Sequence, residues 1–465
     1  MIIEMNHILR AAIIKAEKET GNRCYVVGGY VRNILLNRTS PDIDFVVVGD
    51  SIEFAGVCAG YLGNRKVLSF PRFKTARINY KEISAEFVSA RSEKYHPDSR
   101  KPEISESTLE EDLKRRDFTI NSLAARVTEN TESELIDCFG GVADLGKKIL
   151  RTPIDPVETY SDDPLRMFRC VRFAAQLGFR IEKNSFSAIS SNLHRIGILS
   201  PERISEEFFK IMSSDNPVKG IWLMYRSGLL GEVFPELIEL KGIEERNGSG
   251  HKDIFIHTLK VLYNISRMTQ KKELRIAALM HDIGKPQVKY YKKNQGWSFH
   301  GHDDRGAEIF ETIANRIKWS NSIRNYVSKM IRLHHRPISL TRDEVSDSGV
   351  RRLLFEGGSE VDDLMILCRA DITTANKNKL ARYLENYDRL KEKIISVEEK
   401  DRLRNFKPPV NGGEIMKLFD LTEGPAVGRI KNALLEAVLS GNIENNRESA
   451  VAFLEKMRKT EADKL

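Results

Sequence analysis

Residues 42–48 place the first constraint on the fold. The run reads Asp-Ile-Asp-Phe followed by three valines, and such a β-branched, apolar run favours a buried strand. A buried strand requires partners in a sheet and helices over its faces. Candidates for these partners and helices are the strand-like runs 24–27, 75–80 and 83–88 and the helical runs 8–18 and 31–36. The first 150 residues therefore predict a mixed α/β fold.

The remainder of the chain has a different character. Residues 91–109 are polar, contain Pro and Ser and show no periodicity, so we predict a mobile loop there. After about residue 150 the strand signals stop, and short Pro- and Gly-containing stretches separate helical patterns up to Leu465. The predicted class is therefore α+β, with a small sheet-containing head followed by all-α parts.

Composition limits the classes of function. The 74 Lys and Arg residues exceed the 66 Asp and Glu residues by eight, which is compatible with a nucleic-acid partner without being diagnostic. The longest apolar runs have five residues, far short of the ~18 that a membrane-spanning helix needs, so a membrane protein is excluded. No secretory signal is legible, and the five cysteines never form a CxxC pair. We therefore expect a cytoplasmic protein.

Two acids stand at the start of the predicted strand. Asp42 and Asp44 are separated by one residue, so both side chains leave the same face while their apolar neighbours point into the core. Neighbouring carboxylates repel each other unless a cation lies between them, and such oxygen ligands suit Mg²⁺ joined to substrate phosphates. The alternative is a surface strand with two solvated acids. Glu86, which alternates with apolar neighbours, is a candidate third acid or a simple exposed residue.

A glycine turn precedes these acids. Gly28 and Gly29 lie between a predicted strand and a predicted helix, where backbone N–H groups can approach a phosphate at a helix N-terminus. Arg32, in the first turn of that helix, can add a charge-assisted contact to a triphosphate. A lone Gly-Gly pair is a weak signal, but this pair lies fourteen residues before the acids. The combination predicts a nucleotide-binding site.

Five motifs follow one another between residues 24 and 212. They are Gly-Gly-Tyr-Val-Arg at 28–32, Asp-Ile-Asp at 42–44, Arg-Arg-Asp-Phe-Thr-Ile-Asn at 115–121, Asp-Asp-Pro-Leu-Arg at 162–166 and Arg-Ile-Ser-Glu-Glu at 203–207. Together they resemble the class II tRNA nucleotidyltransferase and bacterial poly(A) polymerase family. Asn33 departs from the family pattern, in which the glycine turn usually ends in Arg-Asp.

The resemblance implies a polymerase β-like head with a mixed sheet, followed by a helical neck. It implies that the nucleotide's phosphates and ribose are held by Arg115, Arg116, Asp117 and Asn121. It also implies that Arg203 and Glu207 brace a base-selecting helix. In the family the stretch 91–109 corresponds to a loop involved in switching from CTP to ATP, and its length here, with the charges of Arg91, Arg100 and Lys101, suggests an intact switch.

The fourth motif bears on the choice of base. Arg166 follows Asp163 by three residues on a predicted helix, so the two side chains are expected to share a face. Guanidinium donors and carboxylate acceptors together match the edges of cytosine and adenine, which present an amine beside an acceptor. Uracil and guanine reverse that order and would make two unfavourable contacts. The alternative is an ordinary surface salt bridge.

The chemistry implied by the resemblance is metal-dependent nucleotidyl transfer, with Asp42, Asp44 and Glu86 as catalytic residues. The 3′-hydroxyl of an RNA end attacks the α-phosphorus of CTP or ATP, and Mg²⁺ at the acids lowers the pKa of that hydroxyl. The expected product is the 3′-terminal CCA of tRNA, whose acceptor arm and elbow are held by shape and backbone charge. The alternatives are poly(A), CC-adding and A-adding polymerases of the same family and a purely structural tRNA-binding protein.

A second cluster of candidate ligands lies downstream, because seven of the ten histidines fall between residues 251 and 335. His257, His281, Asp282 and Asp371 occur in the order that defines the HD phosphohydrolase superfamily, and the residues around them resemble that family too. The resemblance implies a second divalent metal that polarises a phosphate and activates water, with Lys285 near the phosphate.

Other histidines of this region receive different predictions. His302 and His334 are extra candidate ligands, whereas His251, His300 and His335 are expected to be packing or surface residues. If the site is active, a function of another class follows, namely a metal phosphohydrolase acting on RNA ends or nucleotides. The alternative is a degenerate HD fold that serves only as a helical spacer.

The last part is predicted as a helical tail. Gly424 and Gly428 lie in a turn that opens the helix 429–439 and resembles the tail turn of class II tRNA nucleotidyltransferases. Backbone N–H groups there can meet RNA phosphates, and the alternative is a plain helix–helix turn. The predicted parts are a catalytic head at 1–150, a base-selecting neck at 151–245, an HD body at 246–380 and a tRNA-binding tail at 381–465.

Overall fold

The structure of the chain is a computed structural model. It describes residues 5–64, 66–96, 99–129, 132–242, 245–246, 249–250, 253–293, 295–340, 345–374, 376–401 and 409–462. Two compact units are present, Met1–Pro235 and Glu236–Leu465. His251 and the side chains of Arg100 and Lys101, which the sequence predictions name, lie outside what the structure describes.

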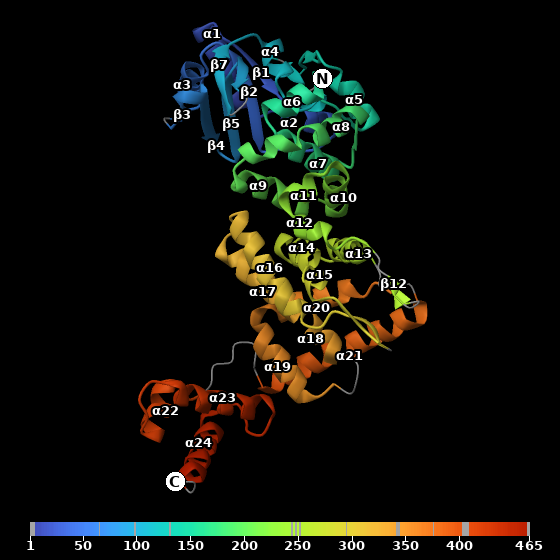
Figure 1. Cartoon of the computed structure of the whole chain (residues 1–465). Helices are drawn as coiled ribbons and strands as arrows, with labels where there is room; N and C mark the ends of the chain where they lie inside the picture. The colour runs from blue at the N-terminus through green and yellow to red at the C-terminus, as the bar shows by residue number, and fades with distance from the viewer. Residues whose placement is uncertain are drawn as a thin grey trace. The chain divides into compact units, whose positions relative to one another are not determined.

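A mixed seven-stranded sheet organises the N-terminal part of the first unit (Figure 1). The strand order is β3-β4-β5-β2-β1-β8-β9, in which β2 and β5 are parallel and the other neighbours are antiparallel. The strands are β1 (Arg23–Val27), β2 (Asp42–Val48), β3 (Leu68–Phe70), β4 (Thr75–Tyr80), β5 (Ile83–Ser89), β8 (Ala124–Arg126) and β9 (Leu135–Ile136). The helices are α1 (His7–Thr20), α2 (Gly29–Leu35), α3 (Ser51–Tyr61), α4 (Leu109–Lys114) and α5 (Gly141–Lys147). The predicted mixed-sheet head is confirmed.

Alternation within β2 decides which face of the sheet becomes the core. Ile43 and Phe45 are buried, and the Phe45 ring stacks on Phe87 of β5 with ring centres 4.8 Å apart. Phe54 of α3 packs against Phe87 as well, so α3, which is itself packed on α1, covers this face. The polar residues of the same strands therefore project from the opposite face.

Strand pairing brings polar residues of three strands into one row. Asp44 of β2 is directly opposite Glu86 of β5, and Glu86 is directly opposite Arg77 of β4. Directly paired residues project on the same side of a sheet. Glu86 lies between the buried residues Ala85 and Phe87, as its predicted alternation requires.

Residues 91–109 are not the loop that the sequence predicts. Arg91–His96 (β6) and Ser99–Glu106 (β7) pair as an antiparallel hairpin with a register shift between Lys94 and His96. A two-stranded ribbon buries neither face fully, so nothing imposes the hydrophobic alternation by which a strand is recognised in a sequence. The prediction of a mobile loop is therefore wrong for the described residues.

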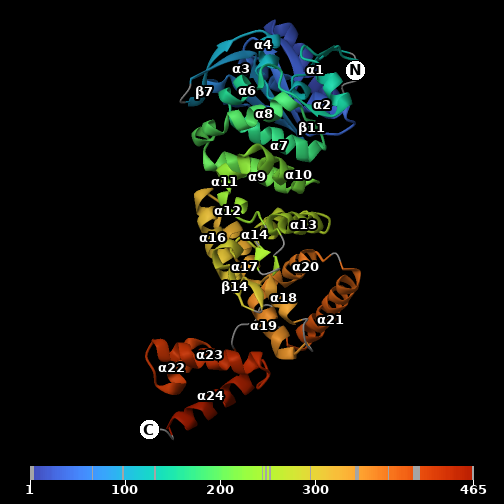
Figure 2. The same ribbon diagram turned by 45° about the vertical axis from the view of Figure 1, so that its right-hand side comes forward.

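Helices make up most of the rest of the first unit. The exception is a short parallel pair, β10 (Ile149–Leu150) with β11 (Arg180–Ile181). Helix α7 packs against α9 and α10, and the three lie side by side (Figure 2). The helices are α6 (Pro156–Asp162), α7 (Leu165–Leu177), α8 (Lys183–Ser191), α9 (Pro201–Met212), α10 (Pro217–Ser227) and α11 (Leu229–Val233), and α12 (Pro235–Ile238) starts at the last residue of this unit.

The second unit is also mostly helical. Its helices are α13 (Ile254–Ser266), α14 (Lys272–Met280), α15 (Lys285–Val288), α16 (His302–Arg316), α17 (Asn321–Leu333), α18 (His335–Leu340), α19 (Asp347–Gly357), α20 (Val361–Asp371), α21 (Lys377–Asp401), α22 (Gly412–Phe419), α23 (Pro425–Leu439) and α24 (Arg447–Ala462). Within the described ranges, every helix is too short or too polar to cross a bilayer.

Two small hairpins depart from the prediction that everything beyond residue 150 is helical. They are β12 (Glu245–Arg246) with β13 (Ser249–Gly250), and β14 (Tyr290–Lys292) with β15 (Gly296–Ser298). Strands of two or three residues are too short to display a period-two pattern, which explains why the sequence gives no signal for them.

Candidate active site and metal centre

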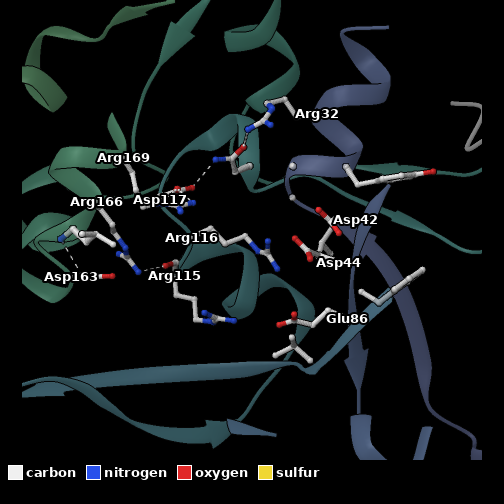
Figure 3. A pocket seen from close by; sticks show the side chains of 18 of the residues that line it. Arg32, Asp42, Asp44, Glu86, Arg115, Arg116, Asp117, Asp163, Arg166 and Arg169 are labelled. Atoms are coloured by element: carbon white, nitrogen blue, oxygen red, sulfur yellow. Dashed lines mark hydrogen bonds and ion pairs between the residues drawn. The ribbon is translucent and has the colours of Figure 1, made fainter. Parts of the chain in front are cut away.

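An open cleft with a volume of about 1380 Å³ lies in the first unit. Its acidic side is the polar face of the head sheet, and arginines from the segment after α4 and from α7 lie opposite (Figure 3). The residues predicted from the sequence that line this cleft are Gly28, Gly29, Arg32, Asp42, Asp44, Glu86, Arg115, Arg116, Asp117, Asn121, Asp163, Arg166 and Arg203.

The acidic side consists of Asp42, Asp44 and Glu86. Asp42 and Asp44 project from β2, and Glu86 is opposite Asp44 on β5 (Figure 3). Burial raises the pKa of Asp44; the charge of Arg116 opposes this rise, and the carboxylates of Glu86 and Asp42 add to it. Acids whose charges destabilise one another are relieved by a bound cation, and oxygen donors of this kind suit Mg²⁺. The donor set therefore fits a divalent metal ion.

The glycine turn and Arg32 lie beside these acids. Gly28 has a φ of 70°, and a Cβ there would lie 2.8 Å from Nη1 of Arg116, so both backbone conformation and space require glycine. Arg32 is buried: its Nη1 donates to Oδ1 of Asn121 at 2.7 Å and its Nη2 to Oδ1 of Asn33 at 2.9 Å. Burial lowers the pKa of Arg32 to about 10. Asn33 thus accepts a hydrogen bond at the position where the family has a carboxylate.

Asp112 organises the arginine pair of the third motif. It is buried and accepts from Nη2 of Arg115 at 2.5 Å and from Nη2 of Arg116 at 3.0 Å. Nη1 of Arg115 also donates to Glu93 of the β6–β7 hairpin at 3.0 Å, which ties the hairpin to the cleft. Arg116 extends toward Asp44 (Figure 3). Asp112 is absent from the predicted site, although its position three and four residues before the arginines on a helix is a recognisable signal.

Asp117 is buried among cationic and amide groups. It accepts from Nδ2 of Asn121 at 2.9 Å and from Nε of Arg169 at 2.7 Å. Burial by itself raises the pKa of this carboxyl, but Arg169, the Asn121 amide and Arg166 together outweigh burial and lower the pKa to about 2. Asp117 therefore stays ionised and fixes Arg169 at the cleft.

We expect Asp117→Asn to destabilise the first unit. Because the folded pKa of about 2 lies below that of an unfolded aspartate, the ionised carboxylate stabilises the fold above pH ~4, and this contribution is lost as the pH falls toward 2. The expected loss in the free energy of unfolding is about 2 kcal/mol at neutral pH. Urea unfolding should give the same difference at pH 7 and pH 5.5 and a smaller one at pH 3. A difference independent of pH over this whole range would contradict the assignment.

Two further arginines of α7 belong to the cleft although the motifs do not single them out. Arg169 and Arg172 line it, and their guanidinium carbons lie 5.4 and 4.2 Å from the ring centre of Phe173. With Arg166 they recur every three residues, which is the sequence signal that identifies them. Glu207 of α9 is buried and ion-pairs with Nε of Arg172 at 2.8 Å, so it joins α9 to α7.

Asp163 and Arg166 do not share a helix face, and that prediction is wrong. Asp163 lies between α6 and α7 in an extended conformation, because Pro164 disfavours a helical conformation of the residue before it. One carboxylate oxygen accepts a backbone N–H at the start of α7 at 3.1 Å. Nη1 and Nη2 of Arg166 donate to the backbone carbonyls of Thr159 and Arg115 at 3.2 and 2.6 Å. The two side chains nevertheless meet at the same end of the cleft (Figure 3).

A second polar cluster lies within the second unit. His257 of α13, His281 and Asp282 after α14, and Asp371 at the end of α20 meet there. Nε2 of His257 lies 3.0 Å from Oδ1 of Asp371 and 3.5 Å from Oδ2 of Asp282. Nε2 of His281 lies 3.3 Å from Oδ2 of Asp282, and Nζ of Lys285 is 2.7 Å from the same oxygen. The four residues that the sequence names as metal ligands are therefore neighbours in space.

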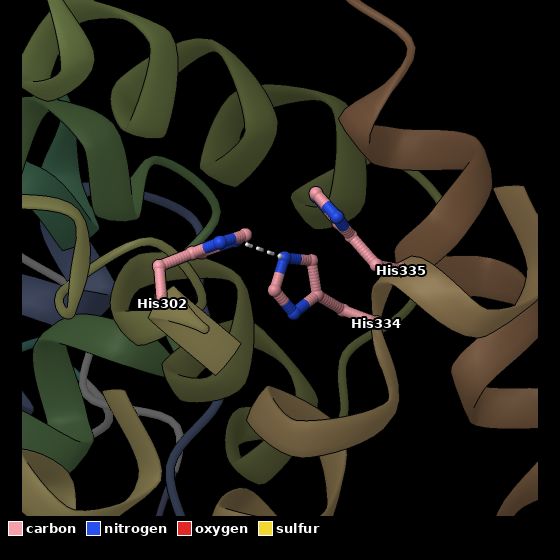
Figure 4. A group of neighbouring side chains, drawn as sticks. All are labelled: His302, His334 and His335. Atoms are coloured by element: carbon pink, nitrogen blue, oxygen red, sulfur yellow. Dashed lines mark hydrogen bonds between the residues drawn. The ribbon is translucent and has the colours of Figure 1, made fainter. Parts of the chain in front are cut away.

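Three more histidines extend this cluster (Figure 4). Nε2 of His302 lies 3.3 Å from Nε2 of His334 and 3.6 Å from Oδ1 of Asp282. Ring nitrogens of His302, His334 and His335 lie within 4.8 Å of one another. His335, predicted as a packing or surface residue, thus lies next to the candidate ligands.

Backbone carbonyls fix the orientation of three of these rings. Nδ1 of His281, His302 and His334 lies 2.8, 2.8 and 2.6 Å from the carbonyl oxygen three residues earlier in the chain. Because a carbonyl only accepts, Nδ1 carries the hydrogen, and the Nε2 lone pair of each ring in its neutral form faces Asp282 and the other rings of the cluster, where it can act as a ligand. Nε2 of His281 and Oδ1 of Asp282 are buried without a hydrogen-bond partner. Imidazole and carboxylate donors arranged in this way fit a divalent transition metal.

The tail glycines occupy positions different from those predicted. Helix α23 begins at Pro425, four residues earlier than expected, so Gly424 precedes it and Gly428 lies in its first turn. A Cβ at Gly428 would meet no atom within 4 Å. The prediction that both glycines belong to a turn is therefore wrong for Gly428.

Three family profiles match the chain in order. Residues 24–151 match the poly A polymerase head domain, residues 178–240 match the probable RNA and SrmB-binding site of polymerase A, and residues 254–376 match the HD domain.

Known proteins match over most of the chain. The A-adding tRNA nucleotidyltransferase of Deinococcus radiodurans is 31% identical and covers 93% of this chain and 94% of its own length. The CC-adding tRNA nucleotidyltransferase of Thermus thermophilus is 29% identical, with 94% of each chain covered. The multifunctional CCA protein of Shewanella frigidimarina is 32% identical over 75% of this chain and 83% of its own.

Solved structures share the fold. The Bacillus stearothermophilus CCA-adding enzyme in complex with CTP is 20% identical, with a TM-score of 0.64 over 99% of this chain and 100% of that one. The Thermotoga maritima CCA-adding enzyme complexed with tRNA is 20% identical, with a TM-score of 0.61 over 97% and 95%. The fold, the relatives and the profiles agree, and the chain belongs to the family of tRNA nucleotidyltransferases and poly(A) polymerases, with an HD domain in its second half.

Proposed function

We propose that the protein adds the 3′-terminal CCA to tRNA from CTP and ATP without a nucleic-acid template. The observation that carries this proposal is one cleft in which Asp42, Asp44 and Glu86 face the arginines of the head and of α7. Nucleotidyl transfer requires such an arrangement, with acids for a metal ion opposite cations for a triphosphate. Relatives that are A-adding, CC-adding and multifunctional CCA proteins support the same class of reaction.

In this proposal Asp42 and Asp44 hold Mg²⁺. When bound, the ion would lower the pKa of the 3′-hydroxyl of the RNA, whose oxygen bonds to the α-phosphorus as pyrophosphate leaves, and would neutralise charge on the phosphate and pyrophosphate oxygens. The turn at Gly28 lets the backbone approach the phosphates closely, since no side chain intervenes. Arg116, which extends toward the acids, supplies fixed positive charge beside the transferred phosphate. The buried pair of Asp117 and Asn121 orients the ribose.

Base selection is proposed for Asp163 and Arg166. The backbone carbonyls that accept from Arg166 occupy two of its five N–H donors and hold its plane in one orientation. Asp163 uses one oxygen to cap α7, which leaves its second oxygen for the exocyclic amine of cytosine or adenine. Uracil and guanine would present a carbonyl to that oxygen and an N–H to the guanidinium.

Asp163→Asn is expected to change the preferred base. Asparagine caps a helix as well as aspartate does, so the fold is retained, but an amide N–H₂ can replace the oxygen that faces the base. We expect the ratio of kcat/KM for CTP and ATP over UTP and GTP to fall at least roughly 10-fold, since mismatched polar groups cause large discrimination. The matched control is Asp155→Asn, which alters the cap of α6 outside the cleft lining. An unchanged ratio would refute base reading by Asp163.

The reaction itself is tested with tRNA transcripts that end at the discriminator base, at C or at CC. Each is incubated with CTP alone, ATP alone or both. Addition of CC from CTP followed by A from ATP is the expected result. Addition of C only, of A only after CC, or of long A runs identifies a CC-adding, A-adding or poly(A) polymerase instead. If no label enters any transcript, the polymerase proposal fails, and binding without turnover would point to a structural tRNA-binding protein.

A second function is favoured by the cluster in the second unit. We propose that His257, His281, Asp282 and Asp371 hold a divalent metal of an HD phosphohydrolase acting on phosphate ends of RNA or on nucleotides. The observation that supports this proposal is that Nε2 of His281 and Oδ1 of Asp282 are buried without a hydrogen-bond partner. The additional imidazoles of His302 and His334 enlarge the donor set around Asp282. A metal bound there polarises a phosphate and supplies an activated water.

We also propose a role for each part of the chain. The head at 1–150 carries catalysis, the neck at 151–245 selects the base, the body at 246–380 carries the HD centre and the tail at 381–465 binds tRNA near Gly424 and Gly428. Arg203 and Glu207 brace α7. All five cysteines are free, as is usual in a reducing compartment, and we propose that the protein is located in the cytoplasm.

A further inference from the structure

Large apolar side chains are exposed at the edge of the catalytic sheet. Leu68 and Phe70 of the edge strand β3 are 53% and 48% exposed, and Phe73, in the 3₁₀ turn Pro71–Phe73 that follows, is 53% exposed. Solvated side chains of this size gain nothing from folding, and a cluster of them marks a contact surface more often than isolated ones do. We call Leu68, Phe70 and Phe73 the apolar edge.

The apolar edge lies on the same face of the sheet as the catalytic acids. Leu68 is directly opposite Arg77, Arg77 is opposite Glu86, and Glu86 is opposite Asp44, so one row runs from β3 to β2. Phe70 lies two residues after Leu68 and shares its face. Three strand spacings separate the ends of this row, which amounts to about 14 Å. A ligand that extends from the acids along this row therefore reaches the apolar edge.

The turn that carries Phe73 is held firmly although its ring is in water. The Phe73 carbonyl accepts from Nη1 of Arg91 at 3.0 Å and from the Thr75 hydroxyl at 3.1 Å. The next carbonyl, that of Lys74, accepts from the buried Ser51 hydroxyl at 2.7 Å and from the backbone N–H of Ser89 at 3.0 Å. These bonds fix the backbone that carries the ring before any ligand arrives, which reduces the entropy lost on binding.

Charge around the apolar edge indicates the chemistry of its occupant. Arg72 and Phe73 line the same cleft as the acids, and the Arg72 guanidinium carbon lies 5.9 Å from the Phe73 ring centre. Arg77, between the apolar edge and Glu86, adds a second guanidinium, which is ion-paired with the Glu86 carboxylate. Aromatic rings interleaved with guanidinium groups beside a cleft are the combination that binds single-stranded nucleic acid, with bases stacked on the rings and phosphates near the cations.

We propose that the apolar edge is the docking site for the unpaired 3′-terminal nucleotides of the RNA acceptor, with a base stacked on Phe73. This inference rests on the proposed nucleotide addition, since it assigns the path by which the growing end reaches Asp42 and Asp44. Phe73 is then a positioning residue for RNA, and the incoming nucleotide is held elsewhere, by Arg116, Asp163 and Arg166.

The test uses the full chain with Phe73→Ala and with Phe70→Ala plus Phe73→Ala. With a transcript ending in C, we expect the KM for RNA to rise roughly fivefold or more, given the strength of base–aromatic stacking, while the KM for CTP or ATP stays constant. Phe73→Trp should restore the KM for RNA. With an RNA trimmed to a flush end, the variants and the wild type should have the same KM for RNA, because that RNA has no unpaired nucleotides to stack.

The matched control is Tyr61→Ala, which removes a ring that is 44% exposed on α3, the helix that covers the other face of the sheet. An unchanged KM for RNA in the double variant, or an equal rise with flush-ended RNA, would overturn the proposal. So would a wild-type dimer that the double variant converts to monomer in sedimentation, because the occupant would then be a second copy. The affinity of each variant for RNA in the absence of CTP and ATP tests the docking site separately from nucleotide addition. This affinity can be measured even if the wild type adds no nucleotide.

Discussion

Replacement of Asp44 by Asn is expected to reduce nucleotide addition by about 10³-fold or more, because loss of several kcal/mol of metal-derived stabilisation corresponds to factors of this size. Asp42→Asn should behave similarly. Both side chains project from β2 beside Glu86, and burial together with neighbouring carboxylates raises the pKa of Asp44. Amides keep the shape of the side chains but remove the charge that the proposed metal site depends on. The readout is incorporation of labelled CTP and ATP into tRNA transcripts over a range of Mg²⁺ concentrations.

The control for this experiment is Glu53→Gln, an exposed acid on α3 in the same unit. It should leave addition unchanged. Because the amide variants relieve repulsion between carboxylates, their melting temperatures should equal or exceed that of the wild type in the absence of metal. Addition that persists in both Asp42→Asn and Asp44→Asn would remove the assignment of the metal site, whatever the stability of the variants.

The second large effect is expected at the HD centre. Asp282→Asn should lower divalent-metal affinity by at least about 100-fold, since it removes a charged ligand on which four imidazoles converge. Metal content after dialysis, measured by elemental analysis, should fall together with hydrolysis of 2′-phosphate or 2′,3′-cyclic phosphate ends. Nucleotide addition should stay at the wild-type rate, because Asp282 and the catalytic cleft belong to different compact units.

Asp304→Asn is the matched control, an exposed acid on α16 two residues after His302. Unaltered metal content in Asp282→Asn would exclude the proposed centre. If Asp282→Asn loses its metal as expected but the wild type shows no hydrolytic activity, the metal has a structural role and the phosphohydrolase proposal is wrong. Circular dichroism at 222 nm distinguishes either outcome from unfolding of the helical unit.

The elements that the sequence predicts well are those in which local pattern and tertiary environment agree. β2 combines β-branched residues with an alternation of acidic and apolar residues over positions 42–45, so the buried side of Ile43 and Phe45 could be assigned from sequence, and the acids had to project on the other side. The same alternation on β5 predicts the side of the sheet on which Glu86 projects. The order of His257, His281, Asp282 and Asp371 is equally informative, because the four residues come together in space.

Other features lack a local signal. The β6–β7 hairpin is polar on both strands, and its hydrogen-bonded pairing leaves no periodic trace in the sequence. Arg169 shares a three-residue spacing with Arg166 and Arg172, but the spacing does not reveal its partner, which is fixed only when α7 packs beside Asp117 and its Nε donates to that carboxylate. Spacing alone predicts that Asp163 lies on a helix, because it ignores the effect of Pro164 on the preceding residue.

By itself, the sequence determined the class of fold, the family and the identity of the acids, because alternation, glycine turns and motif order are local properties. Only the tertiary structure decided which arginines face those acids, which imidazole nitrogen is free and which apolar side chains remain exposed at the sheet edge. Those properties depend on strand register, helix packing and burial, which join residues far apart in the chain. The row from Leu68 through Arg77 and Glu86 to Asp44 exists only once β3, β4, β5 and β2 are paired.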